Sequence, residues 1–285
     1  MNDTTQNSTP PPVGYPEREV VVQMKDIHLA FDGRQILRGI DLTVYRGETL
    51  VILGGSGCGK STLLNCMTGS LVPDRGTVEV LGSHVCDLTE KQLDSHRIKV
   101  GFLFQHGALF QSMNVRDNLA CVLREHSTLT EEEIDILVKM KLELVGLRHT
   151  VDLRPSQLSG GMRKRVALAR ALVLDPPLML YDEPGAGLDP VSLAGVDRII
   201  ATLARVLGIT SLVVTHHMAS ALRIADRLIF LHGGRVIVEG TPDEFRTHTN
   251  PLLRQFLDGA AEGPLTEAGV DDDYAVSLLG KERRS

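Results

Sequence analysis

The chain has 285 residues, 42% of them hydrophobic, and a formal net charge of −6, which suits one large α/β domain or two small ones. The acidic balance argues against nucleic-acid binding, which usually shows a basic face, so a protein surface is the better candidate partner. The four cysteines form no C-x-x-C pair that would indicate a zinc or disulfide framework, and no stretch approaches the roughly 18 apolar residues of a membrane span.

The first predicted elements are a tail and an antiparallel β layer. Residues 1–18 are rich in Thr, Asn, Ser and Pro, and therefore bury too little apolar surface to order themselves. Two β-rich segments follow at 20–31 and 40–44, with the strong turn sequence Asp32-Gly33 between them. We therefore expect a disordered tail followed by antiparallel strands.

Strand and helix segments then alternate along the chain. Alternation of this kind predicts a mostly parallel sheet with helices on both faces, and hence an α/β fold. The predicted segments are strands at 49–53, 77–81, 100–104, 178–181, 211–214 and 228–231, a helix at 60–68, and a last hairpin across Gly233-Gly234.

A helical insertion interrupts the alternation. Residues 115–145 hold helical periodicity with charged faces and no strand pattern, so we assign a helical subdomain to about 106–175. The domain as a whole is predicted to span 19–257. Residues 258–285 then form an acidic extension with a short apolar patch at 276–279, a possible contact between subunits.

A glycine-rich sequence follows the strand predicted at 49–53. It fits G-x-x-x-x-G-K-[ST] and stands between a predicted strand and a predicted helix, the context that this phosphate-binding pattern requires. Its backbone N–H groups favour phosphate, Lys60 offers a charge to the β and γ phosphates, and Ser61 can ligate magnesium. The alternative, a glycine-rich turn with an unrelated lysine, leaves the flanking elements unexplained. The predicted nucleotide-binding residues are Gly54, Gly55, Ser56, Gly57, Cys58, Gly59, Lys60, Ser61 and Thr62.

Two carboxylates end the apolar strand at 178–181. A P-loop needs an acidic partner for its metal ion, and Asp182 is that candidate. Glu183 follows at once and can orient and polarise the attacking water. Paired acids might instead begin a helix, but Pro184 and Gly185 favour a turn.

The sequence LSGGM at residues 158–162 precedes a basic amphipathic helix at 163–172. Alone, S-G-G is typical of a flexible turn or a helix cap. In register between the P-loop and the paired acids, however, the chain resembles the ATP-binding domain of ABC transporters. The resemblance implies a P-loop NTPase with an antiparallel β subdomain, a mostly parallel core sheet and a helical subdomain. Met162 replaces the glutamine that often follows LSGG.

The same resemblance implies roles for single residues elsewhere. Phe31 would stack on adenine, although a lone aromatic at a strand end also suits a core. Gln105 would be the Q-loop glutamine that contacts magnesium and water, and its alternative is a plain loop amide. Asp189 would belong to the D-loop, and His216 would contact the γ-phosphate, with His217 standing where an aspartate often follows.

The resemblance to ABC transporters also implies partners. Two copies would pair head to tail, so that Ser159, Gly160 and Gly161 of one copy close over the ATP and Mg²⁺ bound by the other, and ATP is hydrolysed to ADP and phosphate. The segment 105–126, QHGALFQSMNVRDNLACVLREH, would receive a membrane permease. It resembles the ATP-binding subunits of maintenance-of-lipid-asymmetry (Mla) type phospholipid transporters, as do LSGGM, MKLELVGL at 140–147 and RQFLDGAAEGP at 254–264.

The Mla-type resemblance implies phospholipid transport between the inner membrane and the periplasmic or outer-membrane side. The chain would lie on the cytoplasmic side of a bacterial inner membrane, bound to the permease. Further partners would be a small STAS-domain regulatory protein and an MCE-domain lipid-binding protein.

Three alternatives remain at this point. An importer subunit for another small substrate would share every catalytic residue. A soluble ABC protein acting on DNA or ribosomes usually has two ATPase domains or a long coiled coil, whereas this chain has one P-loop, one LSGG and an acidic charge. A non-hydrolysing, ATP-gated scaffold is disfavoured by the intact Lys60, Asp182, Glu183 and His216.

Overall fold

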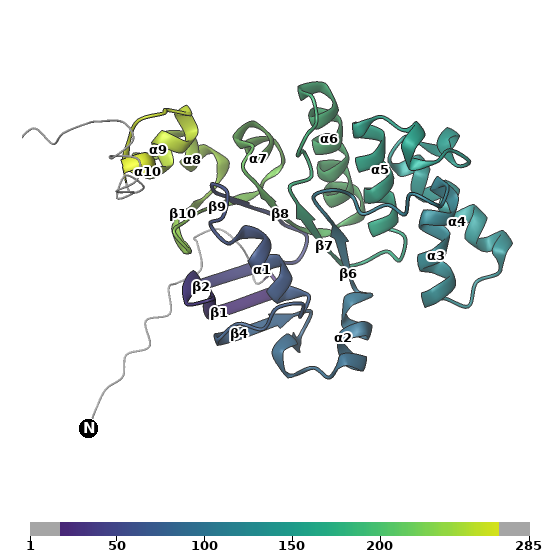
Figure 1. The fold of residues 1–285 in the computed structure, drawn as a ribbon, viewed down its shortest axis with the longest axis horizontal. Coiled ribbons are helices and arrows are strands. Elements are labelled where there is room, and N and C mark those ends of the chain that lie inside the picture. Colours follow the sequence, from purple (N-terminus) through teal and green to yellow (C-terminus); the bar gives the residue numbers. More distant parts are fainter. Residues whose placement is uncertain (1–17, 268–285) are drawn as a thin grey trace, which may run out of the picture.

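The computed structural model describes residues 18–267, which form two sheets with helices packed around them (Figure 1). The predicted apolar patch at 276–279 and nearly all of the predicted tail lie outside these residues. One sheet has four strands in the order β2-β1-β4-β5, and the other has six in the order β10-β9-β3-β8-β7-β6. Within residues 18–267, no helix is both long enough and apolar enough to cross a bilayer.

The four-stranded sheet is the predicted antiparallel layer. Asp32 and Gly33 both adopt left-handed backbone conformations, which two-residue hairpin turns require. The second strand begins at Arg34 and not at residue 40, because the polar start and the bulge at Gly39, where φ is 76°, hide its β pattern. The strands are β1 (Val20–Phe31), β2 (Arg34–Tyr45), β4 (Arg75–Val80) and β5 (Ser83–His84).

The six-stranded sheet is parallel except for β10, which pairs antiparallel with β9. The last hairpin and the predicted strands are present here, except that the segment predicted at 77–81 is β4 of the antiparallel sheet, where it pairs with β1. The predicted α/β fold class is confirmed. The strands are β3 (Thr49–Leu53), β6 (Val100–Leu103), β7 (Leu178–Asp182), β8 (Thr210–Thr215), β9 (Arg227–His232) and β10 (Arg235–Gly240).

Side chains of the parallel strands alternate between two cores, because successive residues of a strand point to opposite faces. In β3, Leu50 and Ile52 pack with α1 and the antiparallel sheet, whereas Val51 and Leu53 pack with the larger group of helices. Full burial on both faces explains why these strands are continuous apolar runs in the sequence. The helices flanking the sheet are α1 (Lys60–Met67), α2 (Glu90–Arg97), α6 (Pro190–Leu207), α7 (Met218–Ile224), α8 (Pro242–Thr247), α9 (Pro251–Asp258) and α10 (Pro264–Glu267).

The helical insertion lies at one end of the molecule, away from the antiparallel sheet (Figure 1). Val166, Leu168, Ala169 and Leu172, which the amphipathic pattern directs inward, are all buried there. Its helices are α3 (Val115–His126), α4 (Glu131–Leu144) and α5 (Gly160–Ala171), with short 3₁₀ turns at Arg148–Thr150 and Pro155–Gln157. Another 3₁₀ turn, Val85–Asp87, lies outside the insertion and follows β5.

The C-terminal helices fold back on one another. Gln255 of α9 is buried, and its side chain accepts from the Leu265 backbone N–H at 2.6 Å and donates to the Ala260 carbonyl at 3.1 Å. The boundary predicted between 257 and 258 falls in the last turn of α9. At least up to residue 267, the predicted extension continues directly from the folded domain.

Candidate active site

The glycine-rich loop joins β3 to α1, and two of its glycines are required by close contacts. A Cβ at Gly54 would lie 2.4 Å from the Leu231 carbonyl oxygen. A Cβ at Gly59, where φ is 104°, would lie 2.6 Å from the Leu37 side chain of β2. The loop can therefore take this tight course only with glycine at both positions. Its tip, at Ser56 and Gly57, is exposed.

Lys60 is the first residue of α1 and is 7% exposed. Its Nζ donates to the carbonyl oxygens of Gly54 at 2.9 Å and Gly55 at 3.0 Å, and lies 3.7 Å from Oε1 of Glu183. The ammonium group is thus held between the phosphate loop and a buried carboxylate. Cys58 has no comparable charge, because burial raises the pKa of its thiol.

Ser61 and Asp182 form a pair of hard oxygen donors beside Lys60. The Ser61 hydroxyl donates to Oδ1 of Asp182 at 2.9 Å, which joins the first turn of α1 to the end of β7. Burial raises the pKa of Asp182, so a nearby cation would favour its charged form. A hydroxyl and a single carboxylate fit Mg²⁺, which keeps several waters and takes other ligands from phosphates. Residues 18–267 contain no cluster of three or more His, Cys, Asp or Glu that could hold a metal ion.

Glu183 is turned into the site by an unusual backbone. Its φ is 47°, a left-handed conformation that costs a non-glycine residue about 1–3 kcal/mol. Its N–H donates to the Val214 carbonyl at 3.0 Å, and its carbonyl accepts from the N–H of Ala186 at 3.1 Å. The predicted turn is therefore present, and it directs the carboxylate back toward Lys60.

His216 is the histidine that meets this carboxylate. Its Nδ1 lies 3.0 Å from Oε2 of Glu183, and its backbone N–H donates to the same oxygen at 3.3 Å. The His217 ring packs on the His216 ring with centroids 4.2 Å apart. Lys60, Glu183 and His216 therefore form one cluster at the C-terminal ends of the parallel strands, where α/β sheets commonly bind ligands.

Other predicted site residues lie outside this cluster. Ser159 and Asp189 are exposed N-caps of α5 and α6, and within residues 18–267 no hydrogen bond or ion pair joins either to Lys60 or Glu183. The two helix starts are neighbours, because a Cβ added at Gly161, close to Ser159, would lie 3.0 Å from the side chain of Ser192, close to Asp189. A cleft of about 490 Å³ opens beside these helix starts. Because Gly161 has no side chain, the LSGG segment can pack against the start of α6.

Phe31 and Gln105 lie at strand ends. Phe31 is 45% exposed at the tip of the β1–β2 hairpin, so it is not a core aromatic. Gln105 is exposed in the loop after β6, with its side chain available to solvent. Its backbone carbonyl accepts a hydrogen bond from the Lys164 side chain. The contacts predicted for both side chains involve a nucleotide and stay predictions.

The loop after Gln105 is held by two residues whose role the sequence did not reveal. Arg170 of α5 donates to the carbonyls of Gly107 at 3.1 Å and Ala108 at 2.8 Å, and its guanidinium lies 5.7 Å from the Phe110 ring centre. Asn118 of α3, fully buried, accepts from the Phe110 N–H at 2.8 Å and donates to the Phe110 carbonyl at 3.1 Å. These bonds join the G-A-L-F segment to the second asparagine of M-N-V-R-D-N within this chain.

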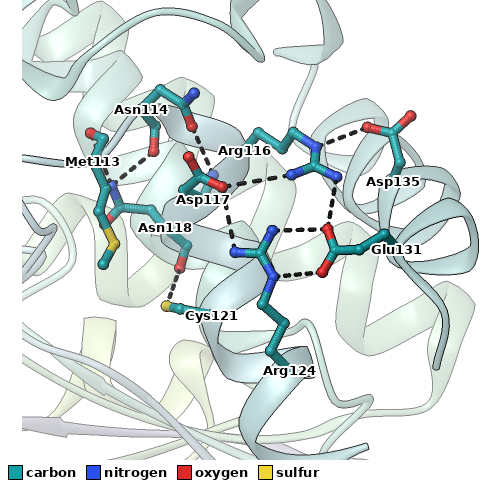
Figure 2. Close-up of polar contacts among 9 residues, drawn as sticks. All are labelled: Met113, Asn114, Arg116, Asp117, Asn118, Cys121, Arg124, Glu131 and Asp135. Atoms are coloured by element: carbon teal, nitrogen blue, oxygen red, sulfur yellow. Dashed lines mark hydrogen bonds and ion pairs between the residues drawn. The ribbon is translucent and has the colours of Figure 1, made fainter. Parts of the chain in front are cut away.

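An ion-pair network joins α3 to α4 behind this loop (Figure 2). Arg124 lies 2.6 Å from Oε1 of Glu131, and Arg116 lies 3.0 Å from Oδ1 of Asp135. Hydrogen bonding to Arg124 holds the pKa of Glu131 at about 2. Asn114 caps α3 by accepting from the Asp117 N–H at 2.7 Å. Ion pairs thus link α3 to α4 in the insertion, and the loop after Gln105 lies next to these helices.

The glycine-rich loop, the hydrogen-bonded pair of Ser61 and Asp182, the buried carboxylate with its histidine and the LSGG helix start match the pattern of an ATP-binding cassette. The family model described as "ABC transporter" matches residues 37–186, and the chain belongs to that family. It is 40% identical over 259 residues to "Intermembrane phospholipid transport system ATP-binding protein MlaF" of Escherichia coli, covering 91% of this chain and 96% of that protein.

Two further comparisons extend this result. The chain is 40% identical over 264 residues to "Probable ribonucleotide transport ATP-binding protein mkl" of Mycobacterium tuberculosis, covering 93% of this chain and 73% of that protein. The solved dimeric structure of the cassette MJ0796 in a post-hydrolysis state, bound to ADP and Pi, superposes with a TM-score of 0.72 at 30% identity. That match covers 78% of this chain and 99% of the other.

Proposed function

We propose that the chain is the ATP-hydrolysing subunit of a transporter that moves phospholipid between a bacterial inner membrane and the periplasmic or outer-membrane side. The observation that carries the catalytic part is the buried Glu183 carboxylate, held between Lys60 and His216. The lipid part is supported by the likeness to MlaF, which extends over nearly the full length of both chains.

The chain's own residues account for the chemistry. Loop N–H groups and the start of α1 bind phosphate oxygens, and Lys60 neutralises charge that develops there. Glu183 accepts a hydrogen bond from water and orients it for in-line attack, while His216 contacts the transferred phosphoryl group. Mg²⁺, when bound through Ser61, Asp182 and Gln105, supplies further charge neutralisation to the phosphates.

The second half of each site comes from another copy. The start of α5, where Ser159 is exposed, Gly160 half-buried and Gly161 buried, offers N–H groups and a hydroxyl to an anion. These groups lie apart from Lys60 in their own chain, so they suit the ATP of a partner. The dimeric state of the related cassette MJ0796 supports a head-to-tail homodimer.

A membrane permease fits the groove between α2, β6, α3 and α5. This groove has a volume of about 610 Å³, and its lining includes Phe102, Phe104 and Val122. Phe104 in this lining and Phe110 on the loop beside it are 49% and 52% exposed, so a partner helix would meet apolar side chains here next to charged ones such as Lys91 and Asp94. We infer peripheral attachment to the cytoplasmic face through this permease, with STAS-domain and MCE-domain proteins as further subunits.

A transporter for another small substrate is the second candidate, and the likeness to mkl favours it. The two are separated by purifying the full-length Glu183→Gln variant, tagged, from membranes of its own cells. We expect co-purification of a multi-span permease with bound phospholipid. Recovery of an importer that depends on a solute-binding protein would contradict the lipid assignment, and an untagged strain controls for adherent lipid.

A further inference from the structure

Lys164 is a buried cation of the α5 helix that contacts the backbone of the active site. It is 6% exposed, and its Nζ donates to the Glu183 carbonyl at 3.1 Å and to the Gln105 carbonyl. One ammonium group therefore bonds the backbone of both the water-orienting residue and the Q-loop. The hydrogen bonds of the Lys164 side chain go to these two backbone carbonyls, and its charge also interacts with the carboxylates of Asp182 and Glu183.

The same helix presents Ser159 at its start. Five residues separate Ser159 from Lys164, which is about 7.5 Å along a helix axis. The helix is continuous from Gly160 to Ala171, and the fully buried Val166 and Leu168 hold the turn that follows Lys164 in the core. A displacement at the start of α5 is therefore carried as a rigid body to the Lys164 ammonium group.

Glu183 is sensitive to such a displacement because its backbone is strained. The left-handed φ of 47° persists only while its neighbours hold the turn, and the carbonyl bonded by Lys164 is part of that restraint. Loss of this donor leaves a buried carbonyl without one of its partners and lets the carboxylate leave its place beside His216.

We propose that Lys164 is a positioning residue that couples the α5 helix start, which covers a partner's ATP, to the Glu183 and Q-loop of its own chain. The inference rests on the proposed function and deepens it. Closure of one site thereby sets the geometry of the other, so that the two ATP sites of a dimer communicate through α5.

A second buried lysine provides a matched control. Lys141 of α4 is also 6% exposed, and its Nζ pairs with the Asp175 carboxylate. Lys141 and Lys164 belong to the same subdomain. Replacing either with Met removes a buried charge and keeps a side chain of similar length. Only Lys164 is bonded to the active site, so a general effect of losing a buried cation appears in both variants.

The test compares steady-state ATPase activity of the full-length chain with that of Lys164→Met and Lys141→Met. We expect Lys164→Met to lower kcat about tenfold or more, since small misplacements of a catalytic group have effects of this size. The ATP concentration for half-maximal rate should stay within about twofold, because the phosphate loop is untouched. Lys141→Met should retain wild-type kcat, and Lys164→Arg, which keeps the donors, should exceed Lys164→Met.

A second measurement separates positioning from simple damage. With slow chemistry but intact binding, Lys164→Met should accumulate an ATP-bound dimer on size-exclusion chromatography, which wild type does not. The proposal is overturned by wild-type kcat in Lys164→Met, by an equal loss in Lys141→Met, or by a matching rise in KM. If Lys164→Met does not fold, Lys164→Gln serves with the same expectations. Absence of ATPase activity in wild type would instead contradict the proposed function.

Discussion

The active-site cluster and the LSGG surface of the same chain differ in how completely they are built. Around Lys60, buried polar groups are hydrogen-bonded to one another, and the loop course is set by close contacts. Around Ser159, the polar groups are exposed and bonded only to their own helix start. The difference supports the proposal that the Lys60 region is complete within one chain, whereas the Ser159 region acts on the ATP of a second copy.

Among changes to the Lys60 cluster, we expect Glu183→Gln to have the largest effect on ATP hydrolysis. Loss of a general base typically costs 10²–10⁴-fold, so we expect kcat to fall by at least about 10²-fold. ATP binding should persist and a nucleotide-bound dimer should accumulate in gel filtration. Glu48→Gln changes another buried glutamate, paired with Arg227 away from the site, and should keep kcat. Wild-type turnover in Glu183→Gln would remove Glu183 from its role.

A change in the surface around Ser159 should affect ATP hydrolysis without affecting ATP binding to one subunit. Ser159→Phe is expected to reduce hydrolysis about tenfold or more, because the bulky ring blocks approach of the partner's phosphates. Binding of ATP to the isolated subunit, measured by fluorescence titration, should be nearly unchanged. Thr241→Phe alters an equivalent exposed helix cap on α8 and should leave hydrolysis intact. If Ser159→Phe abolished binding to a single subunit, the site would lie within one chain.

The loop after Gln105 lies beside the Lys60 cluster, and a variant of Asn118 tests whether this loop depends on its hydrogen bonds. Asn118→Ala removes, from a fully buried side chain, both the acceptor for the Phe110 N–H and the donor to the Phe110 carbonyl. We expect the free energy of unfolding to fall by about 1–3 kcal/mol in urea titration. Cys121→Ala on the same helix should change it by much less. Equal stability of the two variants would mean that the loop is held by packing alone.

The smallest effect belongs to the exposed ion pairs of Figure 2. Arg124 and Glu131 are 41% and 59% exposed, so solvent screens their attraction. We expect Arg124→Ala to lower the free energy of unfolding by less than about 1 kcal/mol, and by less still at high salt. A loss above about 2 kcal/mol that ignores salt would show that Arg124 contributes mainly through packing.

The strands and the phosphate loop were predictable because their signals are local. Continuous apolar runs mark β3, β7 and β8, and the glycine pattern fixes the loop between β3 and α1. The sequence did not reveal α2, a mostly polar helix with Leu93 as its main buried apolar contact. Nor did it place the start of β2, where a bulge disturbs the alternation.

The site was predictable only in part, since some contacts join distant residues. Lys164 reaches Gln105 across 59 positions, and no sequence pattern reports such a bond. A signal was present nonetheless: Lys164 lies four residues before the buried Leu168, on the inward face of a helix. The left-handed backbone of Glu183 likewise depends on Val214, which a neighbouring strand supplies.

The division of the site between two copies is tested most directly by mixing two inactive variants. Purified Glu183→Gln is combined with an excess of Ser159→Phe, and ATP hydrolysis is followed. In a mixed dimer, the Ser159→Phe chain keeps an intact Lys60 cluster and receives an intact Ser159 from its partner. The account predicts that the mixture hydrolyses ATP well above the sum of the separate variants. A mixture no more active than that sum would contradict it.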